Sequence, residues 1–210
     1  MDTPFRVTAI EQDPRRPGTV RLELDGTRFG VVPADLIAAE GLSPGQTIAP
    51  DVHERLCAAA DVEAAFRTGL RMLELRPYAR LDLGRRLQRK GHPRAAVDVA
   101  LERLLRLGLL NDEAYARNYV QTRAPRGRGP SRLVRDLMAM GVQRSLIDRA
   151  VAAEWPEGSD RTSMPQALAS KRAAQLGTLP RQTKRRRLLA YLARRGFSGR
   201  DVSALVESVL

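Results

Sequence analysis

The sequence is poor in the residues that build disulfide frameworks and metal centres. Its 210 residues include one cysteine, Cys57, and two histidines, His53 and His92. A single thiol excludes an internal disulfide and a multi-cysteine zinc site, and two histidines far apart in the chain do not supply a metal centre. We therefore expect neither a metal nor a cofactor.

Long apolar runs and aromatic side chains are also scarce. The sequence has no run of about 18 apolar residues, the length that a membrane helix needs. Residues 1–20 contain Asp, Glu and Arg where a signal sequence would be apolar. We therefore predict a cytoplasmic protein without membrane association. Aromatic residues make up 4% and hydrophobic residues 43% of the chain, so its cores must consist mainly of Leu, Val and Ala.

What the sequence does have is positive charge, unevenly distributed. The formal net charge is +12. Residues 1–60 hold 6 Lys/Arg and 9 Asp/Glu, whereas residues 161–210 hold 11 and 2. Of the 36 basic residues, 33 are Arg, which a GC-rich genome would favour, but such a bias does not explain the gradient. A gradient from acidic to strongly basic predicts a polyanionic partner for the far end of the chain.

Residues 5–32 have the alternation and β-branched content of short strands. FRVTAI (5–10), TVRLEL (19–24) and RFGVV (28–32) are separated by a Pro/Gly loop with the exposed arginines Arg15 and Arg16, and by Asp25-Gly26. The Asp-Gly pair indicates a type I′ hairpin, because both residues tolerate a positive φ. A short helix is predicted over residues 33–41, between a proline and a glycine. We therefore predict a small β-rich module with one short helix at residues 1–55.

From about Val62 onward the apolar period becomes helical, and one five-point pattern occurs three times. Each copy has two leucines four residues apart, then a glycine, then two aliphatic residues. Glycine at that position suits a left-handed helix end. The copies are Leu83, Leu87, Gly91, Val97 and Leu101; Leu133, Leu137, Gly141, Ile147 and Val151; and Leu188, Leu192, Gly196, Val202 and Val206.

A further helical stretch precedes each copy, at residues 62–75, 112–123 and 165–176. Three helices per copy predict helical repeats at residues 62–110, 111–157 and 163–210. The predicted fold class is thus mainly α, with three tandem three-helix bundles that stack into an elongated, curved array after the β-rich module.

Arginine is concentrated on the polar side of these helices. A guanidinium binds phosphate or carboxylate through two parallel hydrogen bonds, so such a surface suits DNA or an acidic protein groove. A merely solvated helix face is the alternative for each cluster. The candidate binding residues are Arg85, Arg86, Arg89, Lys90, Arg126, Arg128, Arg132, Arg135, Lys184, Arg185, Arg186, Arg187, Arg194 and Arg195.

The segment GLLNDEAYARNYVQTR (108–123) is the most specific local motif. Asn111 or Asp112 can cap the following helix, and Tyr115 and Tyr119 would share a buried face. With ARLDLGRRLQRKG (79–91) before it and LLAYLARRGF (188–197) after it, this motif resembles the RecX family, regulators of the RecA recombinase. The resemblance covers about residues 62–210 and implies an all-helical, tandem three-helix fold. It implies no function for residues 1–55.

The resemblance also implies a non-enzymatic role in DNA repair, recombination and the SOS response. Proteins of the family bind along the groove of the RecA–DNA filament and lower its ATP hydrolysis, strand exchange and co-protease activity, and several bind DNA unaided. The implied partners are the RecA filament and the backbones of single- and double-stranded DNA. We expect the protein to be a monomer.

Two other kinds of function stay open. An autonomous DNA-binding protein or repressor would place one helix bearing Asn, Gln or Arg in a groove, usually as a symmetric dimer. Here basic residues are spread over three unequal repeats with little Asn or Gln, which favours backbone contact. A structural scaffold is disfavoured by the charge gradient. The loop APRGRGPS (124–131) lacks the ending of a nucleotide-binding loop, so we interpret it as a flexible connector. The sequence shows no arrangement of nucleophile, base and orienting acid, so we do not expect an enzyme.

Overall fold

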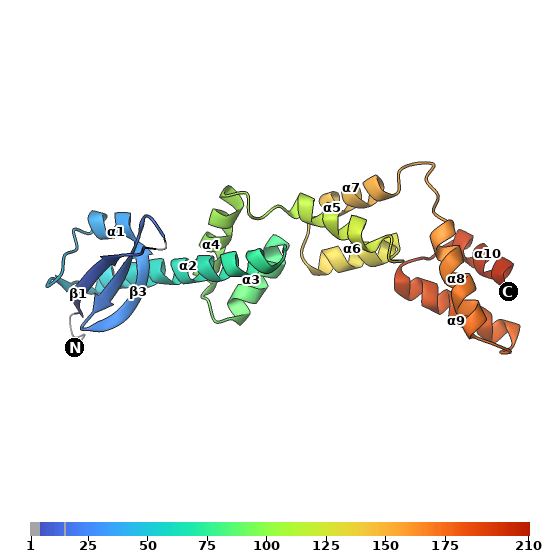
Figure 1. Ribbon diagram of the computed structural model, residues 1–210, viewed down its shortest axis with the longest axis horizontal. Coiled ribbons are helices and arrows are strands. Elements are labelled where there is room, and N and C mark those ends of the chain that lie inside the picture. The colour runs from blue at the N-terminus through green and yellow to red at the C-terminus, as the bar shows by residue number, and fades with distance from the viewer. Residues whose placement is uncertain (1–4, 15) are drawn as a thin grey trace. The chain divides into compact units, whose positions relative to one another are not determined.

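The structure is a computed structural model that describes residues 5–14 and 16–210 (Figure 1). Residues 1–4 of the expected β-rich module and Arg15, which was expected to be exposed, lie outside the described residues. The described residues form an antiparallel sheet followed by a long series of helices, which confirms the predicted mainly helical class. They group into two compact units, of which the first runs to Tyr78 and includes Asp82–Leu110, and the second comprises Ala79–Leu81 and Asn111–Leu210.

The sheet consists of β1 (Phe5–Gln12), β2 (Thr19–Leu24), β3 (Thr27–Pro33) and β4 (Thr47–Ile48), in the order β3-β2-β1-β4. Asp25 and Gly26 join β2 to β3 with φ values of 50° and 74°, as a type I′ turn requires. The three predicted strands are therefore confirmed. The fourth strand was not predicted, because two residues are too few to show a period.

Helices α1 (Ala34–Ala39) and α2 (Pro50–Leu75) follow the strands. Val7, Leu22 and Leu56 are fully buried in the core that the sheet forms with these helices. The helix expected to begin at residue 62 begins at Pro50. The segment that continues it toward its N-terminus is Ala-rich and shows little apolar periodicity, so the sequence pattern did not indicate this start. The sequence 56–61, left between the module and the first repeat, is therefore helical.

The C-terminal part of α2 packs with α3 (Arg80–Arg89) and α4 (Arg94–Arg106) in the first unit. Phe66 of α2, Leu87 of α3 and Leu104 of α4 are buried in their common core. A Cβ added to Gly69 would lie 2.9 Å from Cδ1 of Leu104, so α2 and α4 approach closely only because residue 69 is glycine.

The second unit holds two further groups of three helices. One consists of α5 (Asp112–Arg123), α6 (Pro130–Ala139) and α7 (Arg144–Glu154), and the other of α8 (Ser163–Gln175), α9 (Arg181–Arg195) and α10 (Arg200–Val209). Each group has its own apolar core. The limits of the three repeats as separate domains remain a prediction.

The five-point pattern forms the centre of each core. All six of its leucines are fully buried, and its glycines have the predicted left-handed conformation. Gly141 has φ +83°, and an added Cβ there would lie 2.6 Å from the Leu81 side chain. The leucines are Leu83, Leu87, Leu133, Leu137, Leu188 and Leu192, and the glycines are Gly91, Gly141 and Gly196.

Candidate basic interface

Helix α9 carries the densest group of predicted binding residues. Its Leu188 and Leu192 are fully buried, so the other faces of the helix are turned to solvent. Pro180 precedes the helix with φ −54°, and Gly196 ends it with φ +94°. Among the described residues, four of its predicted binding residues form no ion pair; Lys184 is half-buried and the other three are exposed. We call this set the α9 cluster: Lys184, Arg186, Arg187 and Arg194.

Arg185 of α9 has a different environment, because it pairs with Glu207 of α10. Arg181 contacts the same carboxylate at 3.3 Å. These hydrogen bonds from Arg185 and Arg181 hold the pKa of Glu207 below its usual value. The sequence did not reveal this partnership, because Glu207 lies far along the chain and on another helix.

The second group of predicted residues is largely engaged within the fold. Arg128 Nη1 lies 2.6 Å from Asp136 Oδ2, and Arg132 Nε lies 2.9 Å from Asp136 Oδ1. The Tyr119 hydroxyl donates to the same carboxylate at 3.2 Å. Burial raises the pKa of Tyr119, and the charge of Asp136 raises it further. Arg132 lies four residues before Asp136 on the same helix, whereas Arg128 comes from the loop that precedes it.

The loop of residues 124–131 is not the flexible connector expected from its glycines. The backbone N–H of Gly129 donates to the carbonyl of Arg195 at 2.7 Å, and that of Ser131 donates to the carbonyl of Gly196 at 3.3 Å. The Arg195 side chain donates to the Gly127 carbonyl at 3.4 Å and lies over the Tyr191 ring. The loop is thus held against the end of α9, which brings predicted residues of the second and third repeats together.

A Cβ on Gly129 would lie 2.5 Å from the Gly196 carbonyl oxygen, which explains the need for glycine in this loop. Of the predicted residues around it, Arg126 and Arg135 are exposed. The Arg135 side chain makes a weak hydrogen bond to the Ser131 carbonyl at 3.4 Å. These two arginines therefore remain available to a ligand.

The predicted residues of the first repeat belong to the first unit. Arg86 of α3 pairs with Asp82 at 2.9 Å, as expected for neighbours four residues apart, and its guanidinium lies 5.3 Å from the Tyr78 ring centre. Arg85, Arg89 and Lys90 are exposed. The structure therefore distributes the predicted site over both units.

Two structural findings concern other functions. No group of three or more His, Cys, Asp or Glu within the described ranges is arranged to hold a metal ion. In the part of the chain that the structure covers, no helix has both the length and the apolar character needed to cross a membrane.

Comparison with known proteins agrees with the repeated architecture. Residues 65–104 match the family model for the first three-helix domain of RecX, and residues 111–151 match that for the second. The regulatory protein RecX of Halorhodospira halophila (strain DSM 244 / SL1) is 32% identical over 148 residues, which cover 70% of this chain and 89% of the relative.

The regulatory protein RecX of Pseudomonas savastanoi pv. phaseolicola (strain 1448A / Race 6) is 36% identical over 97 residues, 45% of this chain and 63% of the relative. The chain thus spans less than two thirds of the length of the Pseudomonas relatives that it matches. A crystal structure titled regulatory protein RecX superimposes with a TM-score of 0.73 over 98% of both chains, at 23% identity. At this identity the likeness shows the fold alone.

The three-helix groups, with arginine on their outer faces, define a protein built of repeated helical units. Its sequence gives the particular family. The chain belongs to the RecX family, whose curated members are named regulatory proteins.

Proposed function

We propose that this protein regulates a RecA-type recombinase by binding its filament on DNA, without catalysis of its own. Membership of a family of regulatory proteins supports this role. The single observation that carries the proposal is the α9 cluster, four basic side chains without an ion pair within the described residues, on a segment where 11 Lys/Arg face 2 Asp/Glu.

Arginine without an internal partner can bind phosphate, and the displacement of counterions makes such binding depend on salt. Arg187 and Arg194 are seven residues apart on α9 and share a face, whereas Arg186 is turned about 100° from Arg187. The cluster can therefore contact two surfaces at once, either DNA and one RecA protomer or two neighbouring protomers. Binding across the filament would lower its ATP hydrolysis and strand exchange, because both require changes along the filament.

The direct experiment measures DNA-dependent ATP hydrolysis by the cognate RecA while this protein is titrated in. We expect hydrolysis to fall as the protein is added, and to fall less with Arg186→Glu/Arg187→Glu. A matched control is Arg94→Glu/Arg106→Glu, which makes the same change of charge at two exposed residues of α4. Hydrolysis that stays unchanged at a molar excess of the natural protein would refute the proposal.

The alternative is an autonomous DNA-binding protein, since three-helix units resemble helix-turn-helix modules. The two functions differ in sequence preference. Phosphate contacts do not depend on sequence, whereas contacts to base edges do. DNA binding that varies little among sequences and weakens steeply with salt supports the filament regulator, whereas one sequence preferred by orders of magnitude supports the repressor. We also propose that the protein acts as a monomer in the cytoplasm.

A further inference from the structure

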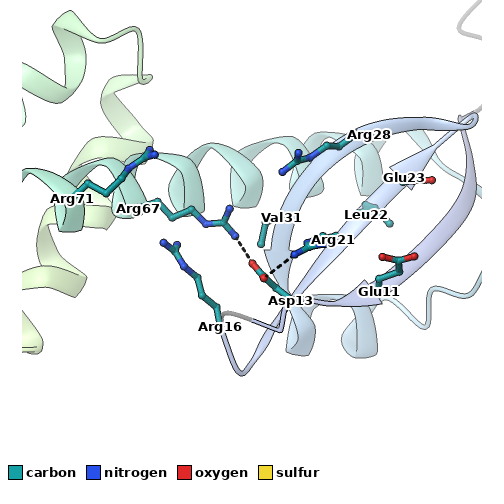
Figure 2. A pocket seen from close by; sticks show the side chains of 10 residues that line it. All are labelled: Glu11, Asp13, Arg16, Arg21, Leu22, Glu23, Arg28, Val31, Arg67 and Arg71. Atoms are coloured by element: carbon teal, nitrogen blue, oxygen red, sulfur yellow. Dashed lines mark hydrogen bonds and ion pairs between the residues drawn. The ribbon is translucent and has the colours of Figure 1, made fainter.

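A polar pocket of about 650 Å³ lies in the first unit, between the sheet and α2. Its walls come from β1, the loop after it, β2, β3 and α2 (Figure 2). The lining is unusual for a module whose sequence is net acidic, because arginines outnumber carboxylates. The arginines are Arg16, Arg21, Arg28, Arg67 and Arg71, and the carboxylates are Glu11, Asp13 and Glu23.

Asp13 forms ion pairs with two of these arginines, Arg21 and Arg67. Its side chain is only 6% exposed and lies 3.1 Å from Arg67 Nη2 and 3.4 Å from Arg21 Nη2. The Asp13 carboxylate therefore links the loop after β1 to β2 and to α2. This bridge gives Arg21 and Arg67 a structural role, but it does not account for Arg16 or Arg28.

Two guanidinium nitrogens remain buried without a hydrogen-bond partner among the described residues, Nη1 of Arg16 and Nε of Arg67. Such a buried donor is costly to leave unpaired, and more so when it is charged. Figure 2 shows the end of Arg67 meeting Asp13, while the end of Arg16 lies to the left of Asp13, below the Arg67 side chain. Burial lowers the pKa of Arg67, and the charge of Arg16 lowers it further, with a smaller contribution from Arg28. The pocket thus holds like charges and free donors that Asp13 alone does not satisfy.

We propose that this pocket binds a phosphate-bearing ligand, with Arg16 and Arg28 as the principal contacts. A phosphate group would accept from the unpaired donors and offset the repulsion among the arginines. The volume lies within the range of small-molecule sites, roughly 300–1,000 Å³. Among the described residues no aromatic side chain lines the pocket to stack on a base, so the phosphate rather than the base would be recognised. This site is separate from the α9 cluster and does not depend on the proposed function.

The test is calorimetric titration of the full chain with inorganic pyrophosphate at low salt. Arg16→Gln/Arg28→Gln leaves both contacts of Asp13 with Arg21 and Arg67 in place, and should lower the affinity at least about tenfold, the effect of losing charge-assisted hydrogen bonds. The matched control Arg94→Gln/Arg106→Gln, at two exposed residues of α4, should leave the affinity unchanged.

Further titrations identify the source of the phosphate. A nucleoside triphosphate that binds more tightly than pyrophosphate indicates a free nucleotide, and a 5′-phosphorylated oligonucleotide that binds most tightly indicates a nucleic-acid end. An absence of binding by all three refutes the proposal. It is equally refuted by a glutamate-rich peptide that binds as well, or by unchanged binding in Arg16→Gln/Arg28→Gln. Circular dichroism checks folding, and Arg28→Gln/Arg71→Gln, which leaves the loop intact, replaces the first variant if it unfolds.

Discussion

The second and third repeats have the same helical pattern but use their arginines differently. In the second repeat Arg128 and Arg132 share Asp136, so both hold the loop and α6 together. In the third repeat Arg186 and Arg187 have no ion pair among the described residues. Residues 111–160 hold 8 Lys/Arg and 7 Asp/Glu, whereas residues 161–210 hold 11 and 2. The difference teaches that equivalent positions in two repeats, such as Arg132 and Arg187, can share the core pattern and yet differ in their ion pairs.

The cap glycines extend this comparison to the backbone. We expect Gly196→Ala to be the most destabilising change, because its Cβ would lie 2.4 Å from the Arg132 backbone nitrogen. Gly141→Ala should cost less, since its Cβ would meet Cβ and Cδ1 of Leu81 rather than backbone atoms. Gly91→Ala is the control, because nothing lies within 4 Å of its Cβ and only the positive φ is unfavourable, at about 1 kcal/mol. For Gly196→Ala the loss should reach about 3 kcal/mol or more.

Denaturant unfolding of the three variants measures this order. Equal losses at all three positions would mean that the close approach between Gly196 and Arg132 is not a rigid feature of the second unit.

The next largest effect concerns DNA affinity in the third repeat. Arg186→Glu/Arg187→Glu should weaken binding to single-stranded DNA by about tenfold or more and reduce the slope of log K against log salt by about 1 to 2. Its melting temperature should change little, because both side chains are exposed and lie away from the buried leucines. Fluorescence anisotropy at several salt concentrations measures the slope, with Arg94→Glu/Arg106→Glu as the control of equal charge.

The two ion-paired arginines of the second repeat should behave in the opposite way. Arg128→Gln/Arg132→Gln removes both ion pairs of Asp136, whose side chain is 16% exposed. We expect a loss of about 1–2 kcal/mol in the free energy of unfolding, because a largely buried carboxylate loses both of its charged partners and keeps the neutral Tyr119 hydroxyl. DNA affinity should change less than in the α9 variant. If the loss in free energy of DNA binding exceeds the loss in free energy of unfolding, these arginines contact the DNA directly and the contrast between the repeats is wrong.

The smallest expected effect is a gain in DNA affinity. Glu207→Gln removes the negative charge that holds Arg181 and Arg185. At neutral pH Glu207 is ionised, since both arginines lower its pKa. The substitution should therefore raise DNA affinity a few-fold, by about the energy of one surface charge contact. Anisotropy titration beside the isosteric control Glu157→Gln, at an exposed residue without an ion pair among the described residues, would detect it. Equal gains in both variants would indicate a general effect of net charge.

Periodicity predicted the parts of the structure that depend on neighbours in the chain. The leucines of each repeat, the left-handed glycines and the Asn111 cap, whose side chain accepts from the Ala114 N–H, follow from local rules. The start of α2 was missed because its Ala-rich residues 57–60 show no amphipathic period.

The sequence did not reveal which arginines of the candidate site are available to a ligand, and the reason is different. Whether an arginine is available depends on carboxylates from other helices, such as Glu207, or from another position in the fold, such as Asp136 for Arg128. The arginine pocket around Asp13 was missed for the same reason, because Arg67 lies far along the chain from it. The sequence therefore supplied the basic residues and their faces, and only tertiary contacts separated those that hold the fold from those that can bind.

Helix α2 has a consequence for folding. It buries Leu56 in the core of the sheet and Phe66 in the core of the first three-helix group, so one rod of 26 residues, about 39 Å long, belongs to both. Fraying at either end removes contacts from only one core, but a break in the middle of the rod weakens both. The β-rich module and the first repeat should therefore melt in one cooperative transition, and a chain cut between residues 55 and 62 should lose the stability of both parts rather than release an independent domain.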